Sequence, residues 1–234
     1  MSRGLFITGT GTGVGKTYVA ALVAAALRAS GKRVGVYKPV ASGCALREGR
    51  LVSPDAVALW EAAGRPGTLE QVCPQRFAAP LAPHLAAHAE GRRVEPQLIR
   101  EGIEFWHKTS DIVLVEGAGG LMSPLDEHRY NADWAAEFGY PLVVVAANVL
   151  GTINATLQTL ITARSCHGGL AVAGVVLNEP SPNPSLLGRG KSGDPSMASN
   201  AAELRARCDA PLLTKVPHGG SLDGTVDWWA LASE

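Results

Sequence analysis

The sequence contains few cysteines, no long apolar run and no net charge. Cys44, Cys73, Cys166 and Cys208 are scattered without a C-x-x-C pair, which argues against a disulfide framework or a zinc site and favours free thiols in a reducing compartment. The longest apolar run, Leu142–Ala147, is too short to cross a bilayer. The 21 basic and 21 acidic residues cancel, so nothing indicates broad binding to nucleic acid or to an anionic membrane. The first residues lack a signal-peptide pattern, so we expect a cytoplasmic protein.

What remains is the composition of a folded α/β protein. The 234 residues are 46% hydrophobic, which is enough to bury a sizeable core. Apolar strand-like runs alternate with helical segments along the chain. This alternation predicts one doubly wound α/β domain, over residues 1–234, with a mostly parallel sheet flanked by helices. The expected strands are 4–8, 33–38, 112–115, 142–147, 171–177 and 211–217, and the main expected helices are 18–28, 96–107, 131–138, 154–165 and 201–207.

The strongest local pattern is the stretch GTGTGVGKT, residues 9–17. It lies between the first predicted strand and an alanine-rich helix, the context that makes such a stretch a phosphate-binding P-loop. Glycines let successive N–H groups point at one phosphate, and the helix N-terminus adds partial positive charge. Lys16 would place a full charge on the outer phosphates, and the Thr17 hydroxyl would ligate Mg²⁺. Gly9 lies one residue earlier than the standard spacing, so we expect a stretched variant; the alternative is a glycine-rich turn with a chance lysine.

Three charged residues stand at the ends of predicted elements. Lys38 ends the second strand, Asp55 lies in the first turn of a helix opened by Ser53 and Pro54, and Glu116 ends the strand 112–115 before a glycine-rich turn. Ligands of open α/β sheets bind at the carboxyl ends of strands, where P-loop proteins place an acid near Mg²⁺. The alternatives are a solvated lysine, an acid that complements the helix dipole and a strand-ending acid before a turn.

Other features leave more than one interpretation open. The N-terminus of helix 154–165 is a ready anion site, and Asn131 is a candidate cap of the helix that follows it. Asn178 could read a base edge or form a turn before a proline. His84 and His88 have the spacing of a two-histidine metal face but no obvious third ligand. Residues 180–200 are predicted to form a mobile loop, with Arg189 and Lys191 as candidate lid or surface charges.

Taken together, the motifs resemble the ATP-dependent dethiobiotin synthetase family of P-loop NTPase-like enzymes. The matching stretches are GTGTGVGKT, YKPVASG around Lys38, the helix start at Asp55, FAAPLAPH, VLVEGAGG around Glu116, LGTIN and the last strand; they run from about residue 5 to residue 217. The stretched P-loop spacing is itself a feature of that family.

The resemblance implies a cyclo-ligase of biotin biosynthesis that acts as a cytoplasmic homodimer on small molecules, with no nucleic-acid or membrane partner. The reaction takes 7,8-diaminopelargonate, CO₂ and MgATP to dethiobiotin, ADP and phosphate. It passes through a carbamate and a carbamic–phosphoric anhydride before the ureido ring closes. Mg²⁺ is the implied cofactor, with ATP as co-substrate.

The resemblance also implies residue roles. Lys38 would bridge the carbamate and the γ-phosphate, and Lys16 would hold the phosphates. The implied Mg²⁺ ligands are Thr17, Asp55 and Glu116. The implied ATP contacts are Gly13, Val14, Gly15, Lys16, Thr17, Tyr18, Glu116, Gly117, Ala118 and Gly119, with Asn178, Glu179, Pro217, His218 and Gly219 on the adenine side. The implied substrate contacts are Thr12 and Ser42 and, across the dimer interface, Leu150, Thr152 and Asn154.

The chain departs from the family pattern at several positions. Gly13 stands where some members carry Glu, Leu81 and Ala82 replace small polar residues, and Lys215 stands where an acid is common. Three other functions compete with the synthetase. A ParA-like switch ATPase usually has an additional P-loop lysine, which is absent between Gly9 and Gly15. A cobyrinate-type amidoligase needs more chain, and a non-catalytic nucleotide-binding protein has no evident use for Lys16, Lys38, Asp55 and Glu116 together.

Overall fold

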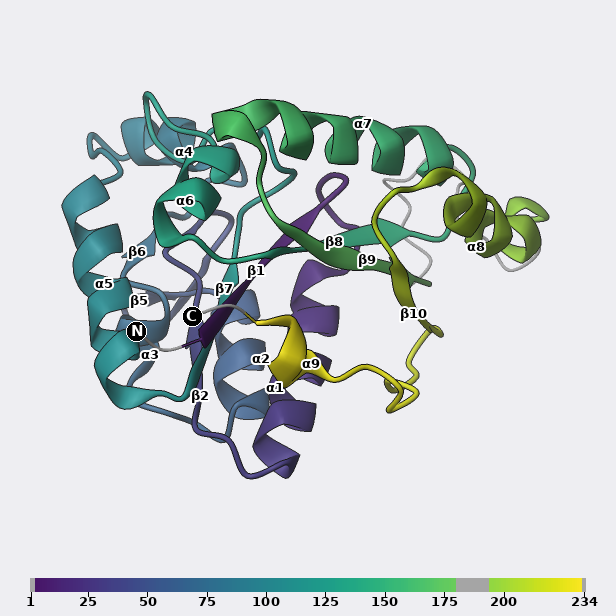
Figure 1. The fold of residues 1–234 in the computed structure, drawn as a ribbon. Helices are drawn as coiled ribbons and strands as arrows, with labels where there is room; N and C mark the ends of the chain where they lie inside the picture. Colours follow the sequence, from purple (N-terminus) through teal and green to yellow (C-terminus); the bar gives the residue numbers. More distant parts are fainter. Residues whose placement is uncertain (1–2, 180–193, 233–234) are drawn as a thin grey trace.

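The computed structural model describes residues 3–179 and 194–232, so Arg189 and Lys191 lie outside the described residues. Its main sheet has six parallel strands in the order β10-β9-β8-β1-β7-β2 (Figure 1). The predicted doubly wound parallel sheet is therefore confirmed. The strands are β1 (Arg3–Gly9), β2 (Val34–Tyr37), β7 (Ile112–Glu116), β8 (Leu142–Ala147), β9 (Val172–Asn178) and β10 (Leu212–Val216).

Helices cover both faces of this sheet. In the view of Figure 1, α7 lies above the strands while α1 and α2 lie below them. All residues of β7 and β8 are buried, as expected for parallel strands that are covered on both sides. The helices are α1 (Lys16–Ala29), α2 (Pro54–Ala62), α3 (Leu69–Val72), α4 (Pro83–Ala89), α5 (Pro96–Thr109), α6 (Asn131–Phe138), α7 (Thr152–Ser165), α8 (Ser196–Arg207) and α9 (Trp228–Leu231).

Two small strand pairs accompany the main sheet. β3 (Val40–Ala41) pairs in parallel with β6 (Gln75–Arg76), and β4 (Ala45–Arg47) forms a hairpin with β5 (Arg50–Val52). β3 begins two residues after Lys38, so the β3–β6 pair continues the chain directly from the carboxyl end of β2.

Two local predictions are wrong. The predicted loop 180–200 extends too far, because α8 already begins at Ser196; the Asp194 carboxylate accepts hydrogen bonds from the Ser196 N–H at 2.9 Å and hydroxyl at 2.7 Å. Tyr130, not Asn131, is the residue that precedes α6, and the Asn131 side chain is fully buried.

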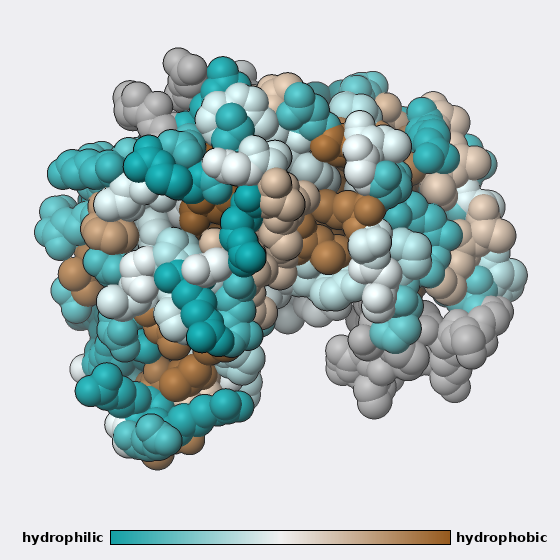
Figure 2. Space-filling view, turned by 90° about the horizontal axis from the view of Figure 1, so that it is seen from below, coloured by the Kyte–Doolittle hydropathy of each residue, from teal (hydrophilic) through white to brown (hydrophobic). Residues whose placement is uncertain are grey.

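The surface is mixed in character. Seen from below, hydrophobic residues reach the surface in separate patches with hydrophilic residues between them (Figure 2). Among the residues that the structure describes, no helix is both long and apolar enough to cross a bilayer.

Candidate functional site

The P-loop connects β1 to α1 and is shaped by a left-handed glycine. Gly15 has φ 92°, and a Cβ placed there would lie 2.1 Å from the Asn178 Nδ2. The amide of Asn178 donates a hydrogen bond to the Val14 carbonyl at 3.0 Å, so it fixes the backbone of the P-loop. Only glycine satisfies both the backbone conformation and this close approach.

Lys16 is buried, and no carboxylate of the described residues forms an ion pair with it. Its side chain is almost enclosed, and its ammonium donates to the Gly11 carbonyl of the same loop at 3.2 Å. Burial lowers the pKa of Lys16, and it outweighs the attraction of the nearby Glu116 and Asp55 carboxylates. The loop thus holds a positive charge that an entering phosphate would satisfy.

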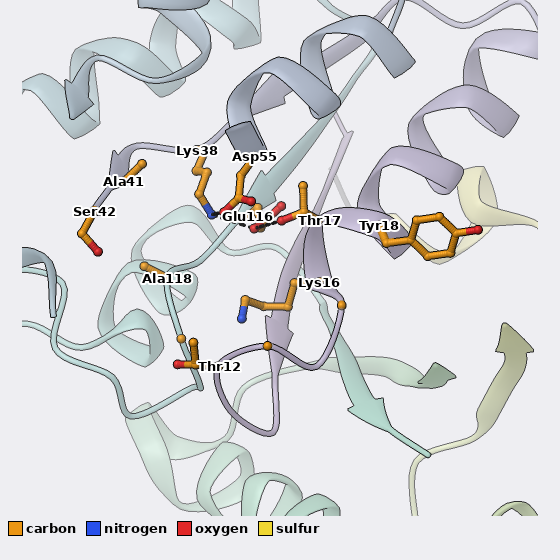
Figure 3. A pocket seen from close by; sticks show the side chains of 13 residues that line it. Thr12, Lys16, Thr17, Tyr18, Lys38, Ala41, Ser42, Asp55, Glu116 and Ala118 are labelled. Atoms are coloured by element: carbon orange, nitrogen blue, oxygen red, sulfur yellow. Dashed lines mark hydrogen bonds and ion pairs between the residues drawn. The ribbon is translucent and has the colours of Figure 1, made fainter. Parts of the chain in front are cut away.

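Lys38, Asp55 and Thr17 converge on Glu116 (Figure 3). The Lys38 ammonium lies 2.6 Å from the Glu116 Oε1 and 3.1 Å from the Asp55 Oδ2, and the Thr17 hydroxyl donates to the same Glu116 oxygen at 2.8 Å. Four segments that are far apart in sequence meet here, because β2 and β7 are adjacent and end at the same edge of the sheet.

The charges in this cluster stabilise one another. Burial alone would lower the pKa of Lys38, but the ion pairs with Glu116 and Asp55 outweigh it and raise that pKa. Burial alone would raise the pKa of Asp55, but Lys38 outweighs it and lowers that pKa. The second oxygen of Glu116, Oε2, is buried and has no hydrogen-bond partner. A buried carboxylate oxygen without a partner is costly, so this atom fits a ligand absent from the protein chain itself.

The cluster opens into a pocket of about 490 Å³ that gathers most of the predicted catalytic and phosphate-side residues. A neighbouring pocket of about 570 Å³ is bounded by Pro80, Leu81, Ala82, Pro83, Ser123 and Pro124 and shares four lining residues with the first. The shared residues are Thr12, Ser42, Ala118 and Gly119. The first pocket is lined by Thr12, Gly13, Gly15, Lys16, Thr17, Tyr18, Lys38, Ala41, Ser42, Asp55, Glu116, Ala118 and Gly119.

The residues predicted for the adenine side lie beyond the P-loop. Glu179 follows β9 and forms an ion pair with Lys215 of β10 at 2.6 Å. This contact, together with the His218 backbone N–H, lowers the pKa of Glu179. The Asn178 Oδ1 is buried without a partner, while its Nδ2 is engaged by the Val14 carbonyl. The Tyr18 hydroxyl donates to the Gly220 carbonyl, which ties α1 to the turn after β10.

The predicted tail-carboxylate site does not line these pockets. Leu150 and Asn154 are exposed at the start of α7, and Thr152 is buried with an unpartnered hydroxyl. The Leu150 N–H donates to the Asp194 carboxylate at 3.1 Å, which links this end of α7 to the start of α8. These three residues therefore line neither pocket, whereas Thr12 and Ser42 line both.

The sequence did not predict which side chain holds the glycine-rich loop that follows Glu116. Asn131 donates to the carbonyls of Ala118 at 2.7 Å and Gly120 at 2.8 Å, and its oxygen accepts from the Ala118 N–H at 3.2 Å. It was predicted as a helix cap, a role that uses the same side-chain chemistry. The pocket-lining Ala41 was also missed, because an alanine carries no chemical signal.

The two-histidine metal face is not a metal centre in the described part of the chain. No group of three or more histidine, cysteine or acidic side chains there could hold a metal ion. His88 instead lies 2.6 Å from the Glu127 carboxylate.

The chain is similar to known proteins over most of its length. A family model described as an AAA domain matches residues 3–225. The chain is 40% identical to the ATP-dependent dethiobiotin synthetase BioD of Rhodopirellula baltica, over 90% of this chain and 82% of that one. It is 44% identical to the ATP-dependent dethiobiotin synthetase BioD of Anaeromyxobacter dehalogenans, over 86% and 84%. A ParA family ATPase from Chlorobium tepidum is similar in fold alone, with a TM-score of 0.50 and 16% identity, over 93% of this chain and 85% of that one.

These relatives confirm the predicted ATP-dependent ligase class and dethiobiotin synthetase activity. Their similarity extends over most of both chains. The chain belongs to the ATP-dependent dethiobiotin synthetase family.

Proposed function

We propose that the chain converts 7,8-diaminopelargonate, CO₂ and ATP to dethiobiotin, ADP and phosphate through a carbamate and a carbamic–phosphoric anhydride. The observation that carries this proposal is the placement of two buried lysines around one pocket. Lys16 donates to the Gly11 carbonyl, while Lys38 bridges two carboxylates. Two anions, the carbamate and the γ-phosphate, must meet in this reaction, and preorganised positive charge lowers the cost of that approach.

The residues at the cluster fit Mg²⁺ as the cofactor. Mg²⁺ prefers oxygen ligands and keeps several waters, and Thr17, Asp55 and Glu116 supply a hydroxyl and two carboxylates beside the P-loop. The unpartnered Oε2 of Glu116 is the atom that most needs such a ligand. When bound, Mg²⁺ would neutralise charge on the ATP phosphates.

The two lysines would then have different roles. Lys16 would exchange its bond to the Gly11 carbonyl for the phosphates, and Lys38 would orient the carbamate oxygen toward the γ-phosphorus. Attack by that oxygen forms the new P–O bond and breaks the bond from the γ-phosphorus to the bridging oxygen, releasing ADP. The second amine then attacks the carbamoyl carbon, forms the ring C–N bond and expels phosphate, which takes the amine proton.

The neighbouring pocket suits the alkyl part of the substrate. Its walls at Pro80, Leu81, Ala82 and Pro124 are apolar, and burial of apolar surface is worth about 25 cal/mol per Å². The substrate amines would lie at the end shared with Thr12 and Ser42. The tail carboxylate would need donors at the other end.

We propose that a second copy of the chain supplies those donors in a homodimer. Leu150, Thr152 and Asn154 line neither the pocket around Lys38 nor its neighbour, and they lie at a helix N-terminus, which favours an anion. Mixing inactive Lys38→Met protein with inactive Asn154→Asp protein tests this arrangement. Mixed dimers should regain activity, because one of their two sites has neither substitution; no recovery after verified subunit exchange would contradict the shared site.

The overall reaction is tested by phosphate release from MgATP with bicarbonate, with and without the diamine. Release that depends on the diamine, with dethiobiotin identified by mass, is the expected result. Lys38→Met should reduce turnover about a hundredfold or more with little change in ATP binding, whereas Lys108→Met, at an exposed lysine of α5, should be unchanged. Diamine-independent ATP hydrolysis would contradict the synthetase proposal and favour a switch ATPase.

A further inference from the structure

A separate pocket of about 410 Å³ lies apart from the catalytic site. It shares no lining residue with the pocket around Lys16. Three arginines line it: Arg50 from β5, Arg76 from β6 and Arg92 from the segment after α4. The remaining lining residues are Leu51, Glu70 and Pro74. Cations therefore outnumber acids three to one on the walls of this pocket.

Arg76 is the central observation. Its side chain is only 19% exposed, yet its nearest carboxylate, on Glu70, lies 3.6 Å away, beyond normal hydrogen-bond length. No residue in the described ranges 3–179 and 194–232 accepts a hydrogen bond from its guanidinium group. A guanidinium carries five N–H donors, and because the Glu70 carboxylate lies beyond hydrogen-bond length, these donors are available to an anionic ligand that enters the pocket.

The other two arginines differ in how firmly they are held. Arg92 donates to the Arg76 carbonyl at 3.2 Å, approaches Glu90 at 3.3 Å and stacks its guanidinium over the Phe77 ring at 4.6 Å. These contacts fix its position on the pocket wall. Arg50 is exposed and has no ion pair within the described part of the chain, so its charge remains available to a ligand.

We propose that this pocket binds the phosphate group of a small molecule. Arginine forms short, paired hydrogen bonds to phosphate oxygens, and three guanidinium groups from three segments suit a tetrahedral anion better than a planar carboxylate. Glu70 and Glu90 offset two of the three charges and leave the pocket net positive. The volume lies within the range of small-molecule sites, roughly 300–1,000 Å³.

The pocket is close in the fold to the catalytic pocket without being part of it. Arg76 is paired with Ala41 in the β3–β6 ladder, and the Phe77 N–H donates to the Ala41 carbonyl at 2.9 Å. Ala41 itself lines the catalytic pocket. Phosphate binding must therefore be measured with residue-level resolution and with the P-loop already filled.

The experiment is a titration of ¹⁵N-labelled full-length protein with inorganic phosphate, in the presence of Mg²⁺ and a saturating non-hydrolysable ATP analogue. We expect saturable shifts of the backbone amides of Arg50, Arg76, Phe77 and Arg92. Arg76→Gln and Arg50→Gln should each weaken the apparent affinity about tenfold or more, because each removes charged hydrogen bonds to the ligand. Arg207→Gln, at an exposed arginine paired with Glu203 on α8, is the matched control and should bind as the wild type does.

Two further titrations separate the ligand classes. Chloride at matched ionic strength reports screening alone, and acetate reports a carboxylate. The proposal is overturned if phosphate shifts do not saturate, if chloride reproduces them, if acetate binds as tightly or if both arginine variants bind like the wild type. Because Arg50 is exposed, its variant should stay folded and keeps the test decisive even if Arg76→Gln is unstable.

Discussion

Replacing Lys38 by methionine removes the positive charge that makes a buried carboxylate tolerable. Glu116 is 1% exposed, and without Lys38 its Oε1 keeps only the Thr17 hydroxyl while its Oε2 has no partner. Breaking a buried ion pair by removing one partner costs about 3–5 kcal/mol. For a chain of this size, that corresponds to a fall in the melting temperature of roughly 6–20 °C.

A double-mutant cycle isolates this coupling from other effects. Glu116→Gln alone should cost less, because Lys38 keeps the half-exposed Asp55 carboxylate at 3.1 Å. The double variant Lys38→Met, Glu116→Gln should recover most of the loss, since replacing both charges of a buried pair is often nearly neutral. All three variants should lose turnover, so stability and activity separate in the double variant.

The assay is urea unfolding of the nucleotide-free protein at neutral pH, followed by circular dichroism. We expect a coupling free energy of about 2 kcal/mol or more between the two positions, within the range for residues in direct contact. A coupling below about 0.5 kcal/mol, the scatter expected for independent sites, would refute the view that Lys38 and Glu116 form one electrostatic unit.

Three other predictions concern the P-loop, the stability at acidic pH and the residues predicted for the adenine side. Gly15→Ala should destabilise the protein by about 1–2 kcal/mol and abolish nucleotide binding by calorimetry, whereas Gly11→Ala, where a Cβ meets nothing within 4 Å, should leave stability unchanged. The pKa of Asp55 is lowered from its usual 3.8, so the stabilisation by its ionised form is present above that pH and is lost as the pH falls through the lowered value. Asp55→Asn should therefore reduce the fall in the free energy of unfolding at acidic pH. An unchanged pH dependence would contradict the ion pair. Lys215→Met should raise the KM for ATP about threefold with little change in kcat, the scale of an exposed ion pair, because Glu179, which also accepts from the His218 backbone N–H, loses its ion pair with Lys215. An unchanged KM would separate this pair from nucleotide binding.

The sheet could be predicted from the sequence because its strands are continuous apolar runs between turn signals. The hairpin β4–β5 was not predicted, since its strands are three residues each and none of these residues is buried. The local signal in the sequence is Gly49. In the structure Glu48 and Gly49 both have positive φ, 49° and 76°, the conformation that a two-residue type I′ hairpin turn requires. Likewise the Asp-Pro-Ser sequence at 194–196 carries the capping chemistry that starts α8 before the predicted residue.

The sequence was sufficient to predict those parts of the site that the positions of the strand ends alone bring together. Lys38 directly follows β2 and Glu116 ends β7. The carboxyl ends of parallel strands lie at one edge of the sheet, so both residues were expected at that edge. The direction of a side chain is different, because packing selects it. Nothing in the sequence indicates that the Asn178 amide turns under the P-loop to the Val14 carbonyl, or that Asn131 fills the loop behind Glu116 instead of capping a helix.

The two lysines differ in the partners that an entering phosphate would have to displace. Lys16 has a carbonyl partner, so a phosphate that reaches it gains a charge–charge contact and displaces only a neutral acceptor. Lys38 has two carboxylate partners, so a phosphate gains less there unless those carboxylates are drawn elsewhere. This difference supports the proposal that Lys16 provides most of the nucleotide affinity and that Lys38 has no permanent phosphate contact. A residue held in that state can respond to a second anion, which is what a carboxylating ligase needs and a simple ATPase does not.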